Sequence, residues 1–169
     1  MTLRPAREQD RLLLENLFNL YRNDLSAYCG DFCALDENGY YDRGIADELL
    51  PFGDGVEPYI ILENGRPAGL ILVTDSRYAL DKCDWRFQEL YLIRPARGRG
   101  LARMAAEKLL AEKPGRWCLS VYKTNHPARR FWDGLIADKG RLVYTVPGED
   151  GMLDIVFDTC QDKASPVSI

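Results

Sequence analysis

Apolar positions recur along this chain with two different periods, and their order predicts a protein that mixes helices and strands. Leu13, Leu14, Leu17, Leu20 and Tyr21 follow helical spacing, which predicts an amphipathic helix over residues 7–21. Ala- and Leu-rich positions predict a second helix over 101–113 that ends at Pro114-Gly115. Two more helices are expected over 41–50 and 127–136.

Short apolar runs between these helices predict strands. They are expected at residues 3–6, 58–62, 68–73, 85–93, 116–122, 141–146 and 152–157. Asn64-Gly65 favours a two-residue hairpin turn, and residues 147–151 join the last two strands. The run 85–93, the helix 101–113 and the run 116–122 form a βαβ crossover. We therefore expect an α/β (α+β) fold, with a central mixed sheet of six to seven strands flanked by about four helices.

Length and charge narrow the class of protein. A chain of 169 residues with 46% hydrophobic content can bury one core, and we expect one domain over 1–157 followed by a disordered polar tail over 158–169. The net charge of -4 leaves no wide basic surface, so no nucleic-acid partner is expected. The N-terminus lacks the apolar run of a signal peptide and no segment resembles a membrane span, so we expect a cytoplasmic protein without a membrane partner.

The cysteines do not indicate a metal or a disulfide framework. They are odd in number and widely scattered, and the single histidine, His126, leaves too few ligands for zinc. We expect small buried or free thiols and no metal. The cysteines are Cys29, Cys33, Cys83, Cys118 and Cys160.

The segment 94–103 has the layout of an anion site. It reads Arg-Pro-Ala-Arg-Gly-Arg-Gly-Leu-Ala-Arg and lies between an expected strand and an expected helix. Gly98 and Gly100 permit a close backbone approach, and the N–H groups at a helix start favour negative charge. The segment does not fit a Rossmann fingerprint, because position 103 is Arg, nor a Walker loop. A pyrophosphate is the expected ligand, and a glycine turn with solvated arginines is the alternative.

Three short patterns carry a resemblance to a known family. Residues 97–102 fit (Gln/Arg)-x-x-Gly-x-(Gly/Ala), and Glu89-Leu90-Tyr91-Leu92 aligns with the Glu-Leu-x-Val strand that precedes this pattern in one superfamily. Downstream, residues 125–132 resemble its Asn-x-x-Ala-x-x-Phe-Tyr segment. Over about residues 1–157 the chain resembles the GNAT acyl-CoA-dependent N-acyltransferases, and within them a poorly characterised group of bacterial predicted acetyltransferases.

The resemblance implies that acetyl-CoA binds here as a co-substrate. Backbone N–H groups of residues 90–92 would stabilise the oxyanion and pair with the pantetheine arm. Asn125 would cap the last helix or bond the cofactor arm, and Phe131 would lie beside the cofactor. The expected acetyl-CoA-binding residues are Leu90, Tyr91, Leu92, Arg97, Gly98, Arg99, Gly100, Leu101, Ala102, Arg103, Asn125 and Phe131.

The implied reaction is acetyl transfer to an amine, which needs a base because an alkyl ammonium has a pKa near ~10.4. Glu89 is the expected base, and a solvated or salt-bridged strand carboxylate is the alternative. Where the family usually has an acidic tyrosine this chain has Trp132, whose indole cannot protonate the leaving thiolate. Tyr122 is a candidate substitute, or else a half-buried strand aromatic. A non-catalytic acyl-CoA-binding module is therefore the second function considered.

The acceptor is expected to be a small-molecule or peptide amine. Acidic and aromatic residues crowd residues 31–48, where only Arg43 is basic, and such a lining would suit a cationic amine. A solvated charge run on the surface is the alternative. Edge strands also make a homodimer conceivable. The residues of this lining are Asp31, Phe32, Asp36, Glu37, Tyr40, Tyr41, Asp42, Asp47 and Glu48.

Overall fold

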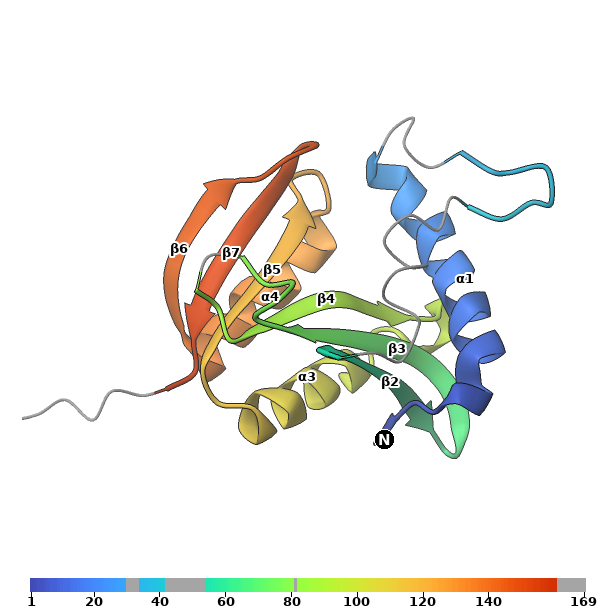
Figure 1. The fold of residues 1–169 in the computed structure, drawn as a ribbon, viewed down its shortest axis with the longest axis horizontal. Helices are drawn as coiled ribbons and strands as arrows, with labels where there is room; N and C mark the ends of the chain where they lie inside the picture. Colours follow the sequence, from blue (N-terminus) through green and yellow to red (C-terminus); the bar gives the residue numbers. More distant parts are fainter. Residues whose placement is uncertain (30–33, 42–53, 81, 161–169) are drawn as a thin grey trace, which may run out of the picture.

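The fold is built on one mixed sheet, drawn in Figure 1 for the computed structural model, which describes residues 1–29, 34–41, 54–80 and 82–160. Seven strands pair in the order β1-β2-β3-β4-β5-β7-β6. This confirms the expected fold class. The strands are β1 (Thr2–Pro5), β2 (Val56–Glu63), β3 (Arg66–Asp75), β4 (Trp85–Leu92), β5 (Arg116–Tyr122), β6 (Arg141–Pro147) and β7 (Met152–Asp158).

Helices cover both faces of the sheet. In Figure 1, α1 (Arg11–Cys29) lies against one face, and α3 (Leu101–Glu112) and α4 (His126–Lys139) lie against the other. Single 3-10 turns, η1 (Glu8–Asp10) and η3 (Arg94–Ala96), precede α1 and α3. Apart from Tyr41, the helix predicted over 41–50 lies outside the described residues.

Helix α1 differs from its predicted bounds of 7–21 at both ends. It begins at Arg11, because residues 8–10 form the 3-10 turn η1 and the Asp10 carboxylate accepts a hydrogen bond from the Arg7 N–H at 2.8 Å. It continues to Cys29, since the sequence contains no glycine or proline between Tyr21 and that residue. The extension matters because it carries Asp24, which pairs with Arg94 and Arg97.

The predicted hairpin between β2 and β3 is confirmed. Asn64 and Gly65 have φ values of 50° and 76°, the left-handed conformations that a type I′ turn requires. The hairpin pairs Ile60 with Leu70, and both are buried under α1, whereas Ile61 faces α3 and α4. Alternate residues of one strand therefore supply two separate cores.

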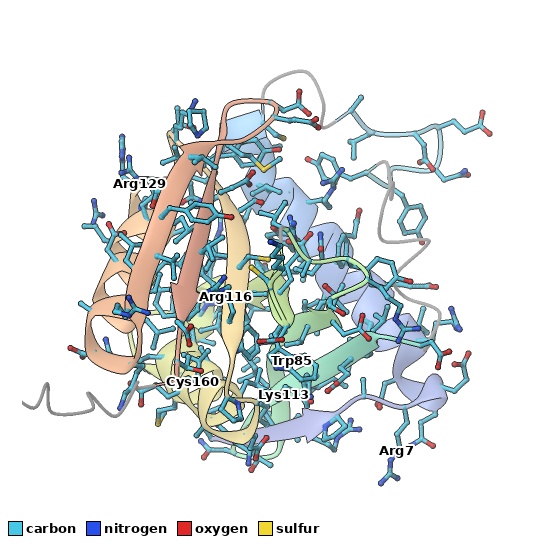
Figure 2. The ribbon with its side chains drawn as sticks, turned by 60° about the vertical axis from the view of Figure 1, so that its left-hand side comes forward. Arg7, Trp85, Lys113, Arg116, Arg129 and Cys160 are labelled. Atoms are coloured by element: carbon cyan, nitrogen blue, oxygen red, sulfur yellow. The ribbon has the colours of Figure 1, made fainter. Side chains whose placement is uncertain are left out.

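An aromatic cluster joins the two halves of the sheet on the face covered by α3 and α4. Phe87 of β4 stacks on Trp117 of β5 with 4.3 Å between ring centroids, and Trp132 of α4 lies 5.0 Å from Phe87. Nearby, the ammonium of Lys113 lies 4.1 Å from the centre of the Trp85 ring. The two residues are labelled next to each other in Figure 2. These contacts fix the position of β4 against β5 where the two strands begin.

Strands β4 and β5 pair for only a short distance. The parallel register runs from Trp85 opposite Trp117 to Phe87 opposite Leu119, and beyond it the strands run apart in Figure 1. A register shift between β3 and β4 leaves Gln88 as an extra residue of β4. Among the strands that the structure describes, none therefore pairs with the second half of β4 along this edge.

Four further features bear on the sequence expectations. Cys29 is disulfide-bonded, which corrects the prediction of a free or buried thiol there, whereas Cys83, Cys118 and Cys160 are not in disulfides. Edge strand β6 exposes Leu142, Val143 and Val146, and a homodimer through an edge strand stays a prediction. No helix in the described part of the chain is long and apolar enough to cross a membrane. The predicted tail lies outside the described residues from residue 161 onward.

Candidate functional site

The free edge of β4 presents backbone groups that pair with no strand among the described residues. Ile93 N–H donates to the Ala68 carbonyl of β3 at 2.9 Å. Because successive residues of a strand direct their backbone groups to opposite edges, Tyr91 also faces β3, whereas Leu90 and Leu92 face the side where β5 has moved away. Of the three residues predicted to supply backbone donors, Leu90 and Leu92 are thus the ones with N–H groups on the open side.

The predicted anion site follows β4 directly along the chain. We call the part of it around Gly98 and Gly100 the glycine cradle. Gly98 and Gly100 both have φ of 75°, and a side chain built on either would meet no atom within 4 Å. The first helical hydrogen bond of α3 runs from Met104 N–H to the Gly100 carbonyl at 3.0 Å, so the N–H groups of Leu101 and Ala102 have no partner within the helix. Space and donors for an anion therefore coincide at this helix start.

Two arginines of the segment bind a residue that the sequence did not indicate. Arg94 donates to the Asp24 carboxylate of α1 at 2.7 Å, and Arg97 donates to the other oxygen of Asp24. Burial raises the pKa of Asp24, but these two hydrogen bonds outweigh it and hold that pKa below its usual value. Arg97 also donates to the Leu92 carbonyl at 2.9 Å. This cluster joins α1 to the turn that leads into the cradle.

The other two arginines are paired as well. Arg99 donates to Glu63 at 2.6 Å, and Arg103 donates to Glu107 at 2.8 Å and to Asp138. All four guanidinium groups therefore have protein carboxylates as partners, so the expected free positive charge is reduced. Backbone N–H groups are the more direct anion donors in this arrangement.

Glu89, the predicted base, is half-buried on the face of β4 that α1 covers. The Tyr21 hydroxyl donates a hydrogen bond to its Oε2. Burial raises the pKa of Glu89 to about 7, against the opposing effects of that hydrogen bond and of the charges on Arg22 and Arg86. A carboxyl group with this pKa exchanges its proton near neutral pH, which is what a general base requires.

The candidate proton donor Tyr122 and the residue at the family's usual tyrosine position, Trp132, have different environments. Tyr122, at the end of β5, is half-buried, and burial raises the pKa of its phenol. It lies two positions after Ser120, whose hydroxyl accepts a hydrogen bond from Arg86, so strand alternation puts Tyr122 on the same side of the sheet as the predicted base. Trp132 is buried instead, and packs against Phe87 and Phe131 with ring centroids 5.0 and 4.9 Å away. Trp132 thus has the contacts of a core residue.

Asn125 and Phe131 lie where α4 begins. The Asn125 side-chain oxygen accepts a hydrogen bond from Ala128 N–H at 3.2 Å, so the predicted capping role is seen directly. Phe131 is partly buried at the margin of the core that α3 and α4 share with the sheet. Both residues remain expected neighbours of the cofactor arm.

The predicted acidic lining is only partly described by the structure. Asp36 accepts hydrogen bonds from Asn38 N–H and Tyr40 N–H at 2.8 Å each, which makes it a turn residue, and Glu37 is exposed. Tyr41 donates to Asn23 of α1 at 3.0 Å. Asp31, Phe32, Asp42, Arg43, Asp47 and Glu48 lie outside the described residues, so the acidic lining stays a prediction.

Three residues near Glu89 were missed by sequence reasoning, namely Tyr21, Arg22 and Arg86. Tyr21 looked like the last apolar residue of a helix, and its hydroxyl gave no signal. Arg86 is three positions before Glu89, which in a regular strand would put the two on opposite faces. The extra residue Gln88 puts them on one face instead.

The family assignment follows from a match to a family model. The chain matches the model described as "Acetyltransferase (GNAT) family" over residues 14–135, which includes Glu89 and the glycine cradle. The chain therefore belongs to the GNAT acetyltransferase family, as its motifs predicted. No match was found among curated proteins.

Solved structures share the fold over nearly the whole chain. An acetyltransferase from Thermus thermophilus is 23% identical with a TM-score of 0.67, covering 92% of this chain and 94% of that one. A GNAT-family acetyltransferase from Streptococcus agalactiae is 17% identical with a TM-score of 0.68, covering 95% and 96%. The ribosomal-protein-S18-alanine N-acetyltransferase from Escherichia coli is 12% identical with a TM-score of 0.60, covering 97% of each chain. At these identities the likeness establishes the fold.

Proposed function

We propose that this protein is an N-acetyltransferase that moves the acetyl group of acetyl-CoA to a primary amine, with Glu89 as the general base. Family membership supports acyl transfer in general. The observation that carries the finer proposal is Glu89 itself, a half-buried carboxyl group with a pKa of about 7 on the strand whose edge is free. No cluster of three or more metal-ligand side chains occurs in the described part of the chain, and the proposed reaction uses none.

The glycine cradle and the free edge of β4 fit the two polar parts of acetyl-CoA. The pyrophosphate would accept hydrogen bonds from backbone N–H groups at the start of α3, where Gly98 and Gly100 leave open space. The amide groups of the pantetheine arm would pair with Leu90 and Leu92, because their backbone groups face the open side. In this arrangement the thioester would lie near the middle of β4, next to Glu89.

The reaction would proceed by direct attack. Glu89 removes a proton from the amine, whose nitrogen forms a bond to the thioester carbonyl carbon. The carbonyl oxygen becomes an oxyanion, and one well-aimed backbone N–H group stabilises such an oxyanion by about 3 kcal/mol. Collapse of the intermediate breaks the carbon–sulfur bond and releases the CoA thiolate. Tyr122 is the proposed donor of the proton that this thiolate takes up.

The test is release of CoA from acetyl-CoA in the presence of a panel of primary amines. Glu89→Gln should lower kcat by about 100-fold and leave the calorimetric Kd for acetyl-CoA unchanged. A matched control is Glu57→Gln, since Glu57 also accepts a hydrogen bond from a tyrosine, Tyr59, at 2.6 Å but lies on β2. Equal activity of the two variants would overturn the role of Glu89.

One observation favours a second candidate, a non-catalytic acyl-CoA-binding module. The residue at the position of the family's usual phenol is Trp132, and it is packed in the core. A protein that binds acetyl-CoA in calorimetry but releases no CoA with any amine would support this candidate. Tyr122→Phe is a further test of the two candidates. An acetyltransferase would lose turnover in this variant, whereas a binding module has no turnover to lose.

A further inference from the structure

Two buried polar groups without partners lie next to each other beside the proposed base. Arg86 and Thr74 are opposite one another in the antiparallel pairing of β4 with β3. The Arg86 Nε and the Thr74 Oγ1 are both buried, and neither has a hydrogen-bond partner among the residues that the structure describes. The register shift at Gln88 puts this pair on the same face of the sheet as Glu89.

The Arg86 guanidinium is held in place by a chain of hydrogen bonds. Its Nη2 donates to the Ser120 hydroxyl at 3.0 Å, and Ser120 donates its own proton to the Asp154 carboxylate at 2.6 Å. Ser120 can therefore only accept from Arg86, which fixes the orientation of the guanidinium. Within the described ranges no carboxylate forms an ion pair with Arg86, and Asp154 reaches it only through Ser120.

A buried donor that lacks an acceptor costs about 1–3 kcal/mol, and the cost is greater for a charged group. A carboxylate would remove that cost, because one oxygen can accept from the Arg86 Nε–H while the other accepts from the Thr74 hydroxyl. Guanidinium groups bind carboxylates with better geometry than any other side chain does. A cationic ligand group, in contrast, would be repelled by Arg86.

The charges around Glu89 favour the same kind of ligand. Arg22 of α1 and Arg86 of β4 both act on Glu89 as positive charges. Arg86 and Glu89 are three positions apart on one strand, so their Cα atoms are separated by about 10 Å or less. Their side chains project from one face of the sheet, and a small molecule with an amine at one end and a carboxylate at the other can contact both.

We propose that the acceptor is a small amino-carboxylic acid, whose carboxylate binds Arg86 and Thr74 while its amine lies at Glu89. This inference rests on the proposed acetyltransferase function and adds the chemical class of its acceptor. It assigns the role of specificity-determining residues to Arg86 and Thr74.

The test compares acceptors that differ only in the carboxylate, with CoA release as the measurement. Suitable pairs are 4-aminobutyrate with butylamine, and 6-aminohexanoate with hexylamine. The acid of each pair should have a kcat/KM at least about tenfold higher, a preference equal to about 1.4 kcal/mol. Arg86→Gln should remove this preference by raising KM for the acid more than for the plain amine, whereas any change that it causes at Glu89 lowers kcat for both members of a pair alike. Arg86→Lys should restore part of the preference.

Two further variants separate recognition from folding. Thr74→Val keeps the shape of the side chain and should reduce the preference for the acid several-fold. Arg116→Gln is the control, since Arg116, labelled in Figure 2, is an arginine of the adjacent strand β5 that pairs with Asp158 at 3.9 Å. It should leave the preference unchanged. Melting curves and acetyl-CoA titrations check that each variant is folded.

The outcomes distinguish this inference from the function on which it rests. If the two members of each pair are acetylated equally well, the carboxylate inference is overturned and the acetyltransferase function stands. If no acceptor releases CoA, the function is overturned, and the acids are titrated into protein saturated with CoA. Binding of an acid to the wild type but not to Arg86→Gln would support the carboxylate site, and absence of binding to the wild type would overturn it.

Discussion

The Tyr21 hydroxyl on α1 donates a hydrogen bond to the Glu89 carboxylate on β4, across 68 positions of sequence. Both side chains are partly buried, and burial raises the pKa of each. The contact holds the carboxylate in one orientation and favours its ionised form. Tyr21 is therefore a positioning residue for the proposed base.

Removal of the Tyr21 hydroxyl should shift the pH profile of the reaction. The groups that act on Glu89 are Tyr21 and Arg22 from α1, Arg86 from β4 and Tyr122 from β5. With a Glu89 pKa of about 7, kcat/KM in the wild type should rise as the pH increases through about 7. In Tyr21→Phe the pKa of Glu89 is higher still, so the rise should move to higher pH. Tyr59→Phe, which removes the matched contact to Glu57, should keep the wild-type profile.

Replacement of the proposed base should stabilise the protein at alkaline pH. The pKa of Glu89 in the folded state, about 7, lies above its ordinary value of 4.5, so the folded state binds this proton more tightly. That contribution to stability is complete below pH 4.5 and is lost as the pH rises through about 7. Glu89→Gln should therefore be more stable than the wild type at pH 8.5, by about 1–2 kcal/mol, and similar at pH 5. Denaturant titrations at both pH values measure this; a variant that is less stable at pH 8.5 would contradict it.

A methyl group in the glycine cradle should weaken acetyl-CoA binding. Gly100→Ala and Gly65→Ala are matched, since both glycines have φ near 75° and open surroundings, but Gly65 lies in the β2–β3 turn. Each variant should lose about 1 kcal/mol of folding free energy from the left-handed conformation. Only Gly100→Ala should raise the calorimetric Kd for acetyl-CoA, by about tenfold. An equal Kd in both variants would place the pyrophosphate elsewhere.

Loss of the Asp24 charge should destabilise the protein more than loss of a surface carboxylate. Asp24 is 16% exposed and binds Arg94 and Arg97, whereas Asp138 is 62% exposed and binds Arg103. Asp24→Asn should lower the free energy of unfolding by about 1–2 kcal/mol, and Asp138→Asn by less than about 0.5 kcal/mol. Chemical denaturation measures the free energy of unfolding of the two variants. Equal losses would show that the cluster of Asp24, Arg94 and Arg97 adds no more stability than a surface ion pair.

A tyrosine at position 132, as is usual in the family, should not act as the proton donor to the leaving thiolate. Because Trp132 fills a packed site against Phe87, Trp132→Tyr should cost about 1–3 kcal/mol of stability. It should leave kcat unchanged or lower. The control is Trp85→Tyr, at a partly buried indole beside Lys113. A higher kcat in Trp132→Tyr alone would mean that the phenol reaches the departing sulfur.

The features that the sequence predicted correctly depend on residues that are close together along the chain. The Asn64-Gly65 turn and the capping by Asn125 depend on neighbours a few residues away, and both are seen in the structure. The motif residues from Glu89 to Ala102 were also recognisable, since their spacing is a property of one strand, one turn and one helix start.

The surroundings of Glu89 could not be predicted, because they depend on distant pairing. One extra residue in β4 brings Arg86 to the face of Glu89, and no pattern in the sequence marks Gln88 as that residue. Likewise Asp24 contacts Arg94 and Arg97 only because α1 continues past its predicted end at Tyr21. The acidic residues of 31–48 suggested a purely cationic acceptor. The positive charges that act on Glu89 are those of Arg22 of α1 and Arg86 of β4, and the sequence did not indicate them.

Three register pairs join strands β1 to β4 with strands β5 to β7. Beyond them, the junction depends on side-chain packing such as that of Phe87 on Trp117. An acyl-CoA arm bound along the free edge of β4 would act as an additional strand and increase the mechanical cohesion of the enzyme. Slower exchange of the amide hydrogens of Leu90 and Leu92 would then report substrate binding before any acetyl group has moved.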